Sequence, residues 1–319
     1  MTSLSCRAPE PPGGAPARRW CDEIPRPAHR ALERVPVSQD WFQVYRVGEG
    51  VFAITEPFQF QETISYLIVG STEALLFDTG LGIGRISGVA EELTPLPVTV
   101  LNSHTHFDHV GGNAEFDRIL AMDTAYTRAN AAGFPHAVLA GEVAPAALCR
   151  PLPAGVEAGE FCTRPFAPSR WLRGGEVLDL GGRRLSVLPV PGHTPDAVAL
   201  YDEEAGLLFT GDTFYEGPIW LFVPETSWSA YAASADPLAA LVPRLKRVHP
   251  AHNSAVSDPR LLIELQSAVR EVSSGRIAGR KGEGDRLEFP FGKFSFVTSR
   301  AILEGREAPS KRGGSGLGD

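Results

Sequence analysis

The residues best suited to chemistry gather in one short stretch, His-Thr-His-Phe-Asp-His at positions 104–109. Three imidazoles and a carboxylate fall within these six positions, directly after an apolar run. Side chains two apart in an extended segment point to the same side, so His104 and His106 can bind one metal ion. Asp108 and His109 follow where the chain has to turn and are free to face a second ion. Such a dense cluster predicts a metal site.

Three further candidate ligands lie late in the chain, in loop-like sequences. They are His193 in Pro-Gly-His-Thr, Asp212 in Thr-Gly-Asp-Thr and His252 in Pro-Ala-His-Asn. The glycines before His193 and Asp212 allow the backbone to turn sharply and to approach an ion closely. Loops that leave one edge of a layered α/β structure can converge on a shared pocket. His249 is a rival of His252 for the last position.

This donor set indicates particular metals and a particular reaction. Imidazole and carboxylate without thiolate suit zinc, and also iron, manganese or cobalt. A shared carboxylate offsets the repulsion between two cations about 3.5–4 Å apart. A metal lowers the pKa of its bound water towards about 7, and the resulting hydroxide can attack an acyl carbon. Asp108, close to that nucleophile, can hold or shuttle its proton.

Alternating strands and helices in both halves of the chain must position these residues. Apolar runs predict strands at 51–54, 65–69, 74–80, 98–101, 176–180, 184–190, 197–201 and 207–210. Helices are expected over 85–93, 124–132, 228–245 and 259–272, and a hairpin over 287–297. Pro237 and Pro243 should divide or kink the helical region that contains them. The pattern predicts an α/β domain of two sheets flanked by helices.

Three segments lie outside this pattern. Residues 1–40 are rich in Pro, Ala, Gly and Arg and are predicted to be a flexible leader, and residues 305–319 a disordered tail. The catalytic domain then spans 41–304. Within it, six prolines punctuate residues 133–168, which is typical of a lid or pocket wall, or of a mobile insertion. The sequence does not decide between these alternatives.

Composition excludes several classes of partner. With a net charge of −8 and a pI of about 5.6, the chain has no general basic surface for nucleic acid or anionic membranes. No apolar run reaches the length of a membrane span, and the first residues lack a signal-peptide core. We therefore expect a cytoplasmic protein with a small-molecule partner, compatible with a homodimer. The four scattered cysteines do not form a disulfide framework, so Cys6 and Cys21 are expected to be unpaired.

Taken in order, the motifs His-x-His-x-Asp-His, Pro-Gly-His-Thr, Gly-Asp-Thr and a late His resemble those of the metallo-β-lactamase-fold hydrolases, over roughly residues 41–300. The resemblance implies a four-layer αββα sandwich with two mixed sheets flanked by helices. It also implies two Zn²⁺ ions, with Fe or Mn as alternatives. The first metal would be bound by His104, His106 and His193, the second by Asp108, His109 and His252, and both by Asp212. His252, rather than His249, matches the family's Pro-x-His position.

The resemblance also implies roles around the metals. Asp78, at a strand end, resembles the carboxylate that orients a ligand histidine, with a simple turn cap as the alternative. Tyr215 lies three residues after Asp212, at the spacing where a tyrosine of the lactonase branch reaches the substrate carbonyl. Asp108 and Tyr215 are therefore predicted to be catalytic, although Tyr215 can also simply line the pocket. Neighbouring aromatic residues suggest an apolar acyl-binding wall, or else plain core; they are Phe214, Trp220, Phe222 and Trp228.

The branch that this chain resembles most is the acyl-CoA thioesterase-like and lactonase-like one, through residues 77–82, 116–118 and 211–217. It implies that a metal-bound hydroxide cleaves a small acyl ester-type bond, a thioester or a lactone. The family's β-lactamases generally lack a bridging Asp, which Asp212 supplies here. Glyoxalase-II-like members continue Pro-Gly-His-Thr with x-Gly-His, where this chain has Pro-Asp-Ala. A persulfide dioxygenase-like enzyme with a single iron is the alternative from another reaction class.

Overall fold

The computed structural model describes residues 20–305 and builds them around three β-sheets. The first sheet has eight strands in sequential order. It is antiparallel from β1 to β5 and parallel from β5 to β8, and therefore mixed. Its strands are β1 (Glu33–Val35), β2 (Gln43–Gly48), β3 (Val51–Thr55), β4 (Ile64–Val69), β5 (Ala74–Phe77), β6 (Val98–Leu101), β7 (Ile119–Met122) and β8 (Arg170–Leu172).

The second sheet has five strands in the order β14-β12-β11-β10-β9. Its pairs are antiparallel except β12 with β14, so this sheet is mixed as well. Its strands are β9 (Val177–Asp179), β10 (Arg184–Pro189), β11 (Val198–Asp202), β12 (Leu207–Gly211) and β14 (Arg247–Pro250).

A third, four-stranded sheet was not predicted as a separate sheet. The predicted hairpin forms two of its strands, and β13 joins that hairpin by parallel pairing with β17. Because β13 and β17 are far apart in sequence, no local pattern indicates this pairing. The strands, in order across the sheet, are β13 (Gly217–Leu221), β17 (Phe294–Ser299), β16 (Arg286–Phe291) and β15 (Arg280–Lys281).

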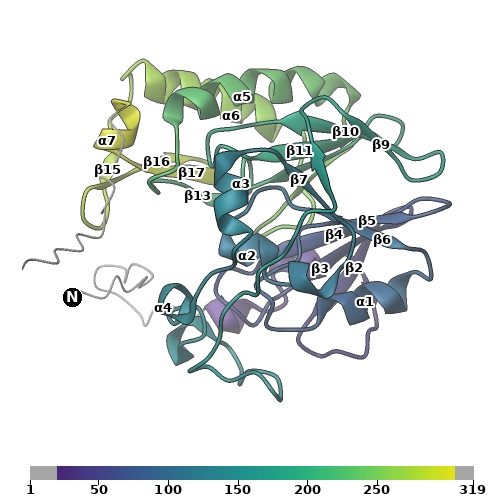
Figure 1. Ribbon diagram of the computed structural model, residues 1–319. Coiled ribbons are helices and arrows are strands. Elements are labelled where there is room, and N and C mark those ends of the chain that lie inside the picture. The colour runs from purple at the N-terminus through teal and green to yellow at the C-terminus, as the bar shows by residue number, and fades with distance from the viewer. Residues whose placement is uncertain (1–19, 306–319) are drawn as a thin grey trace, which may run out of the picture.

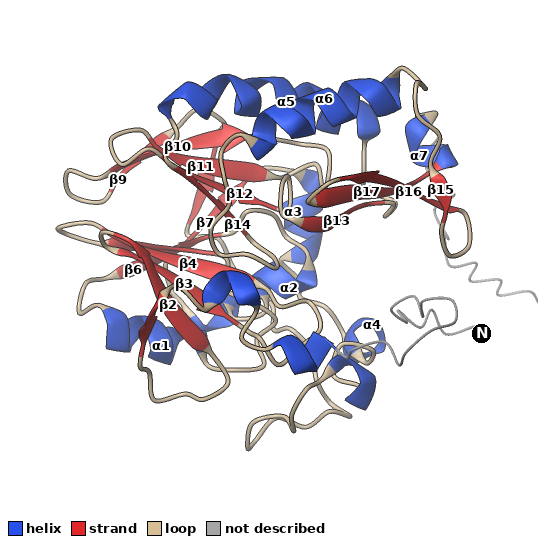
Figure 2. Ribbon diagram, turned by 180° about the vertical axis from the view of Figure 1, so that it is seen from behind, coloured by secondary structure: helices blue, strands red, loops and turns tan. Residues whose placement is uncertain are grey.

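Helices cover the outer faces of the two larger sheets and complete the predicted four layers. Helix α1 (Ile86–Leu93) lies against the first sheet, and α5 (Trp228–Leu241) and α6 (Leu261–Ser273) cover the second (Figures 1 and 2). Pro237 lies within α5 and Pro243 lies in the short 3-10 helix that continues it. The other helices are α2 (Phe107–Val110), α3 (Ala125–Asn130), α4 (His136–Leu139), α7 (Arg300–Leu303), η1 (Trp20–Glu23), η2 (Pro27–His29), η3 (Asn113–Glu115), η4 (Pro145–Ala147) and η5 (Val242–Arg244).

Three apolar cores fill the interfaces between the layers. Strand β5 contributes to two of them, because successive side chains on a strand point to opposite faces. Leu75 and Phe77 belong to the core between the two sheets, whereas Leu76 packs in the core under α1. The third core joins α5 and α6 to the second and third sheets, through residues such as Leu238, Leu265 and Phe296. Burial on both faces fixes the sheets that carry the candidate ligands.

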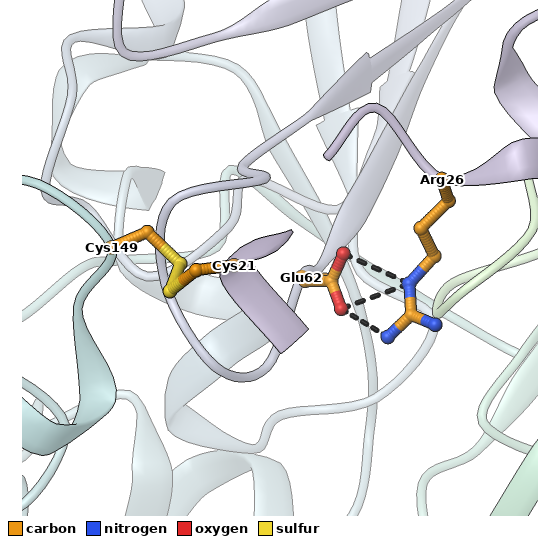
Figure 3. The surroundings of a disulfide bond; sticks show 4 residues. All are labelled: Cys21, Arg26, Glu62 and Cys149. Carbon is orange, nitrogen blue, oxygen red and sulfur yellow. Dashed lines mark hydrogen bonds and ion pairs between the residues drawn. A yellow bond between two sulfur atoms is a disulfide. The ribbon is translucent and has the colours of Figure 1, made fainter. Parts of the chain in front are cut away.

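The segment from residue 20 to residue 40 is structured, which corrects the predicted extent of the flexible leader. It contains η1, η2 and β1, and β1 pairs with β2. Cys21 forms a disulfide with Cys149 (Figure 3), so the prediction that Cys21 is unpaired is wrong. The two cysteines are 128 residues apart, and their spacing carries no signal of pairing. Residues 1–19, with Cys6, and the tail at 306–319 lie outside the described residues.

The insertion at 133–168 is largely irregular and packs on the first half of the domain. Its apolar side chains Leu139, Val143, Phe161 and Phe166 are buried in the core under the first sheet. In contrast, Cys162 is an exposed free thiol. Within the described residues 20–305, no helix is both long enough and apolar enough to cross a membrane.

Candidate metal centre

Loops at one edge of the two larger sheets bring the candidate ligands together. Strand β6 leads into the histidine cluster, and β12 ends at Gly211, immediately before Asp212. Gly211 has a φ of +52°, and a Cβ built there would lie 2.5 Å from the Cβ of Ser103. Only glycine therefore allows the end of β12 to lie against the histidine cluster.

The first group of ligand atoms comes from three histidines. The Nε2 of His104 lies 2.9 Å from the Nδ1 of His106, and the Nε2 of His193 lies 3.0 Å from the same Nδ1. His104 and His193 are buried and His106 is half-buried. The three nitrogen atoms face one another closely enough for one cation to contact them all.

The second group combines a carboxylate with two histidines, and all three residues are buried. The Oδ2 of Asp108 lies 3.5 Å from the Nε2 of His109 and 3.7 Å from the Nε2 of His252. The ligand atoms of this group therefore also surround a space of the size of one ion. Asp108 and His109 reach it from the first turn of α2, which begins directly after His106.

Asp212 lies between the two groups. Its Oδ2 is 3.5 Å from the Nε2 of His193, in the first group. Its Oδ1 is 3.4 Å from the Nε2 of His109 and 3.1 Å from the Nε2 of His252, in the second. One carboxylate thus presents an oxygen to each group, which is the arrangement that a bridging ligand requires.

Backbone carbonyls fix the orientation of two of the histidines. The Nδ1 of His193 lies 2.8 Å from the carbonyl oxygen of Trp220, and the Nδ1 of His252 lies 2.7 Å from that of Gln61. A carbonyl can only accept, so each Nδ1 carries the proton. The inward Nε2 of each ring is then left with a lone pair, the form in which imidazole binds a metal.

Asp78 orients two more histidines through a buried network. It accepts from the Nδ1 of His109 at 3.0 Å, and from the backbone N–H and the hydroxyl of Ser103 at 2.6 and 2.8 Å. Because the Ser103 hydroxyl donates to Asp78, its oxygen accepts from the Nδ1 of His104 at 3.0 Å. Asp78 therefore orients histidines of the centre, which is the first of its two predicted roles.

Glu225 orients His106, the remaining histidine of the first group, and was not predicted from the sequence. Its Oε1 accepts from the Nε2 of His106 and from the hydroxyl of Tyr126, each at 2.7 Å. This contact leaves the Nδ1 of His106 free to face the first group. Glu225 lies in a loop and belongs to no motif, so its role depends on tertiary structure alone.

Asp196, two residues after Pro-Gly-His-Thr, was also given no role from the sequence. It is buried and accepts from three threonine hydroxyls, those of Thr105, Thr127 and Thr194, at 2.6, 3.0 and 2.7 Å. These threonines come from the histidine cluster, from α3 and from the loop that carries His193. Asp196 therefore joins the two loops that supply the first group.

Two histidines of the first group, His104 and His193, are held in their neutral form. Burial lowers the pKa of His104 well below its ordinary value, and the nearby histidines lower it further. Burial and the neighbouring His106 lower the pKa of His193 to about 4. Neutral His104 and His193 direct the lone pairs of their Nε2 atoms at one space beside the Nδ1 of His106, so the group is arranged for a cation.

The carboxylates of the second group are ionised despite their burial. Burial raises the pKa of Asp212, but His252 and His109 lower it more, and it lies well below its usual range. The same two histidines lower the pKa of Asp108 to about 2 against the effect of burial. The Oδ1 of Asp212 and the Nε2 of His109 are also buried without a hydrogen-bond partner in the described part of the chain. Buried groups of this kind need a cation, and an N/O donor set without sulfur suits zinc, iron or manganese.

His249 lies outside both groups. Its Nδ1 donates to the carbonyl of Ala255 at 2.8 Å, and its ring stacks on Phe209 with centroids 4.9 Å apart. It is completely buried in this packing. Of the two late histidines, only His252 lies with the other candidate ligands.

The Tyr215 hydroxyl is engaged by the backbone. It donates to the carbonyl of Pro218 at 2.7 Å and accepts from the N–H of Trp220 at 3.2 Å. The ring packs edge-on against His252, with centroids 5.2 Å apart. The geometry therefore gives no support to the expectation that this hydroxyl reaches a substrate, and it indicates that Tyr215 positions β13 and His252.

The predicted aromatic wall divides into two parts. Phe214 and Trp228 are buried in the core under α5 and α6, so for these two the alternative of plain core packing is correct. Trp220 and Phe222 are partly exposed, and their ring centroids lie 5.6 Å apart. Only the second pair is available to line a binding surface.

Comparisons with known proteins agree with this geometry. A family model described as "Metallo-beta-lactamase superfamily" matches residues 62–252. The chain is 32% identical to an acyl-coenzyme A thioesterase, MBLAC2, of Gallus gallus over 235 residues, which cover 70% of this chain and 84% of the relative. It is 30% identical to a hydroxyacylglutathione hydrolase of Synechococcus sp., over 57% of this chain and 62% of that protein. A solved metallo-beta-lactamase from Pontibacter korlensis has a similar fold, with a TM-score of 0.51 and 18% identity over 72% of this chain and 99% of that one.

Proposed function

We propose that this metal-dependent hydrolase has a dinuclear centre and cleaves acyl thioesters. The premise is that the chain belongs to the metallo-beta-lactamase superfamily. The observation that carries the proposal is the position of Asp212, whose two oxygens face two separate groups of ligand atoms. A site for a single ion has no need of a carboxylate between two such groups.

The residues divide between two cations. The first would be held by His104, His106 and His193, the second by Asp108, His109 and His252, and Asp212 would contact both. We propose zinc, because the donor set contains imidazole and carboxylate only, with iron or manganese as alternatives. Such ions supply a water of lowered pKa and polarise the carbonyl oxygen of the scissile bond.

The protein's own contribution is orientation and charge. Asp78, Glu225 and the backbone carbonyls hold the outer nitrogens of the histidines, which fixes their tautomers before any ion binds. Asp108 keeps a carboxylate oxygen beside the reaction centre, where it can take the proton of the attacking water. Tyr215 acts as a positioning residue through β13.

The choice of a thioester rests on the relatives and on the lining of the site. The acyl-coenzyme A thioesterase and the hydroxyacylglutathione hydrolase that this chain resembles both act, by their names, on acyl thioesters. Trp220, whose backbone carbonyl accepts from His193, and Phe222 are partly exposed and offer an apolar surface that suits an acyl group. A lactone presents the same reacting carbonyl and is the second substrate class to examine.

A substrate panel tests this proposal. Purified protein is assayed with acyl-CoA thioesters, an acylglutathione, an acyl-homoserine lactone and a β-lactam, before and after treatment with a chelator. We expect the thioesters to be cleaved fastest, the chelator to abolish cleavage, and added Zn²⁺ to restore it. Oxygen consumption with a glutathione persulfide and one iron per chain would instead support the dioxygenase alternative.

A further inference from the structure

Four partly exposed aromatic side chains form a continuous strip that starts beside the metal centre. We name Trp20, Phe60, Trp220 and Phe222 the aromatic strip. The ring centroids are 6.3 Å apart between Trp20 and Phe60, 6.4 Å between Phe60 and Trp220, and 5.6 Å between Trp220 and Phe222. The strip reaches the centre through Trp220, whose carbonyl accepts from the Nδ1 of His193.

The strip is not a part of the core that happens to be incompletely covered. On β13, Ile219 and Leu221 point into the core under α5 and α6, and Trp220 therefore points to the opposite face. On that face it meets Phe60, from the loop between β3 and β4, instead of another strand. Contiguous apolar patches that stay open to solvent mark ligand-binding or interaction sites.

The outer half of the strip is assembled from segments that belong to neither large sheet. The loop at 56–63 carries Phe60, whose N–H donates to the carbonyl of Ala147 in the insertion at 3.0 Å. The N-terminal segment supplies Trp20, directly before Cys21. The Cys21–Cys149 disulfide ties this segment to the insertion, next to the ion pair between Arg26 and Glu62 (Figure 3).

We propose that the aromatic strip binds the acyl chain of the substrate, and that the disulfide holds Trp20 in place as its distal end. This inference rests on the proposed thioesterase function. The rings follow one another at steps of about 6 Å, so a two-carbon acyl group at the metals would not extend to Trp20, whereas a long unbranched chain would. None of the four side chains carries a charge, which matches an alkyl chain. The guanidinium of Arg286 lies over the Phe222 ring at 3.9 Å, at the opposite end of the strip from Trp20.

The first test compares chain-length preference. The value of kcat/KM is measured for dodecanoyl-CoA and acetyl-CoA with the wild-type protein, Trp20→Ala and Trp171→Ala. Trp171 is a matched control, because it is also partly exposed but lies on β8 beneath Arg128, outside the strip. We expect Trp20→Ala to lower the value for dodecanoyl-CoA about tenfold, the effect of leaving roughly two methylene groups in water, and to leave acetyl-CoA unchanged. An unchanged ratio, or an equal fall with both substrates, would overturn the proposal.

The second test addresses the disulfide. The double variant Cys21→Ser/Cys149→Ser should lose the preference for dodecanoyl-CoA as Trp20→Ala does, because the segment that carries Trp20 is no longer tied to the insertion. Cys162→Ser is the control, since this thiol is free and exposed. Full retention of the long-chain preference in the double variant would refute the role of the disulfide.

A direct binding measurement separates this inference from the proposed function. If the wild-type protein cleaves neither thioester, the proposed function is wrong, and the strip is judged by calorimetric titration with dodecanoate alone. Weaker binding by Trp20→Ala than by Trp171→Ala supports the strip as an alkyl-chain site. Equal binding by the two variants overturns it.

Discussion

The metal centre and its rim are built in opposite ways. The rim is formed by residues 20–35, the loop at 56–63 and the insertion at 133–168. Every candidate ligand of the centre lies in a short motif close to a strand end, and buried sheets on both sides fix its position. The rim instead depends on pairings between distant segments, such as Cys21 with Cys149 and Arg26 with Glu62. The candidate ligands are therefore specified locally, whereas the rim is specified by long-range contacts.

The largest expected difference is between the two late histidines. His252→Ala should lose about 10³-fold or more in kcat/KM, because removal of a metal ligand forfeits several kcal/mol of transition-state stabilisation. His249→Ala should retain metal and most activity, since its Nδ1 bonds to Ala255 and its ring only packs on Phe209. Steady-state kinetics and metal content of the two variants check this. Equal losses in both would mean that the centre extends to His249.

A smaller effect is expected at the outer edge of the centre. Glu225→Gln should weaken metal affinity by about tenfold to a hundredfold, because the carboxylate that orients His106 becomes neutral. Competition with a chelator of known affinity measures this. Glu203→Gln, at an exposed position in the turn between β11 and β12, is the matched control. Unchanged metal affinity in Glu225→Gln would show that the charge of Glu225 does not strengthen metal binding by His106.

The rim should respond to pH through His29. Burial, with a smaller effect of Arg26, lowers the pKa of His29 to about 4 in the folded protein, and its Nε2 accepts from the N–H of Ala255. In the unfolded chain, His29 takes up a proton near pH 6.5. The stability that neutral His29 contributes to the fold is therefore complete above pH 6.5 and is lost as the pH falls towards 4. From pH 7 to 5.5 the wild-type protein should lose about 1 kcal/mol more unfolding free energy than His29→Gln. Denaturant unfolding at both pH values measures it, and parallel losses in both proteins would contradict the assignment.

The smallest effect on catalysis is expected at Tyr215. Tyr215→Phe removes the hydrogen bonds to Pro218 and Trp220 and should cost about 1 kcal/mol in unfolding free energy. The value of kcat/KM should change by less than about threefold, because the backbone at Pro218 and Trp220 engages the hydroxyl. A fall of about a hundredfold in kcat at unchanged stability would restore the catalytic role expected from the sequence.

The fold and the centre were predictable from sequence to the extent that their signals are local. Apolar strands, proline breaks and glycine-preceded ligands predict the sheets, α5 with its continuation, and the grouping around Asp212. The third sheet was not predictable, because β13 pairs with a strand about 70 residues further along the chain. Glu225 and the disulfide were missed for the same reason. Disulfides are typical of oxidising compartments. The Cys21–Cys149 bond therefore does not support the cytoplasmic location, which stays a prediction.

Metal stoichiometry of the wild-type protein and of Asp212→Asn tests the dinuclear centre most directly. Both proteins are freed of metal, titrated with Zn²⁺, and measured by calorimetry and elemental analysis. We expect two ions per wild-type chain and no more than one tightly bound ion in Asp212→Asn, because the carboxylate that faces both groups is lost. A single ion in the wild-type protein, or two ions bound equally tightly in Asp212→Asn, would contradict the bridging role of Asp212.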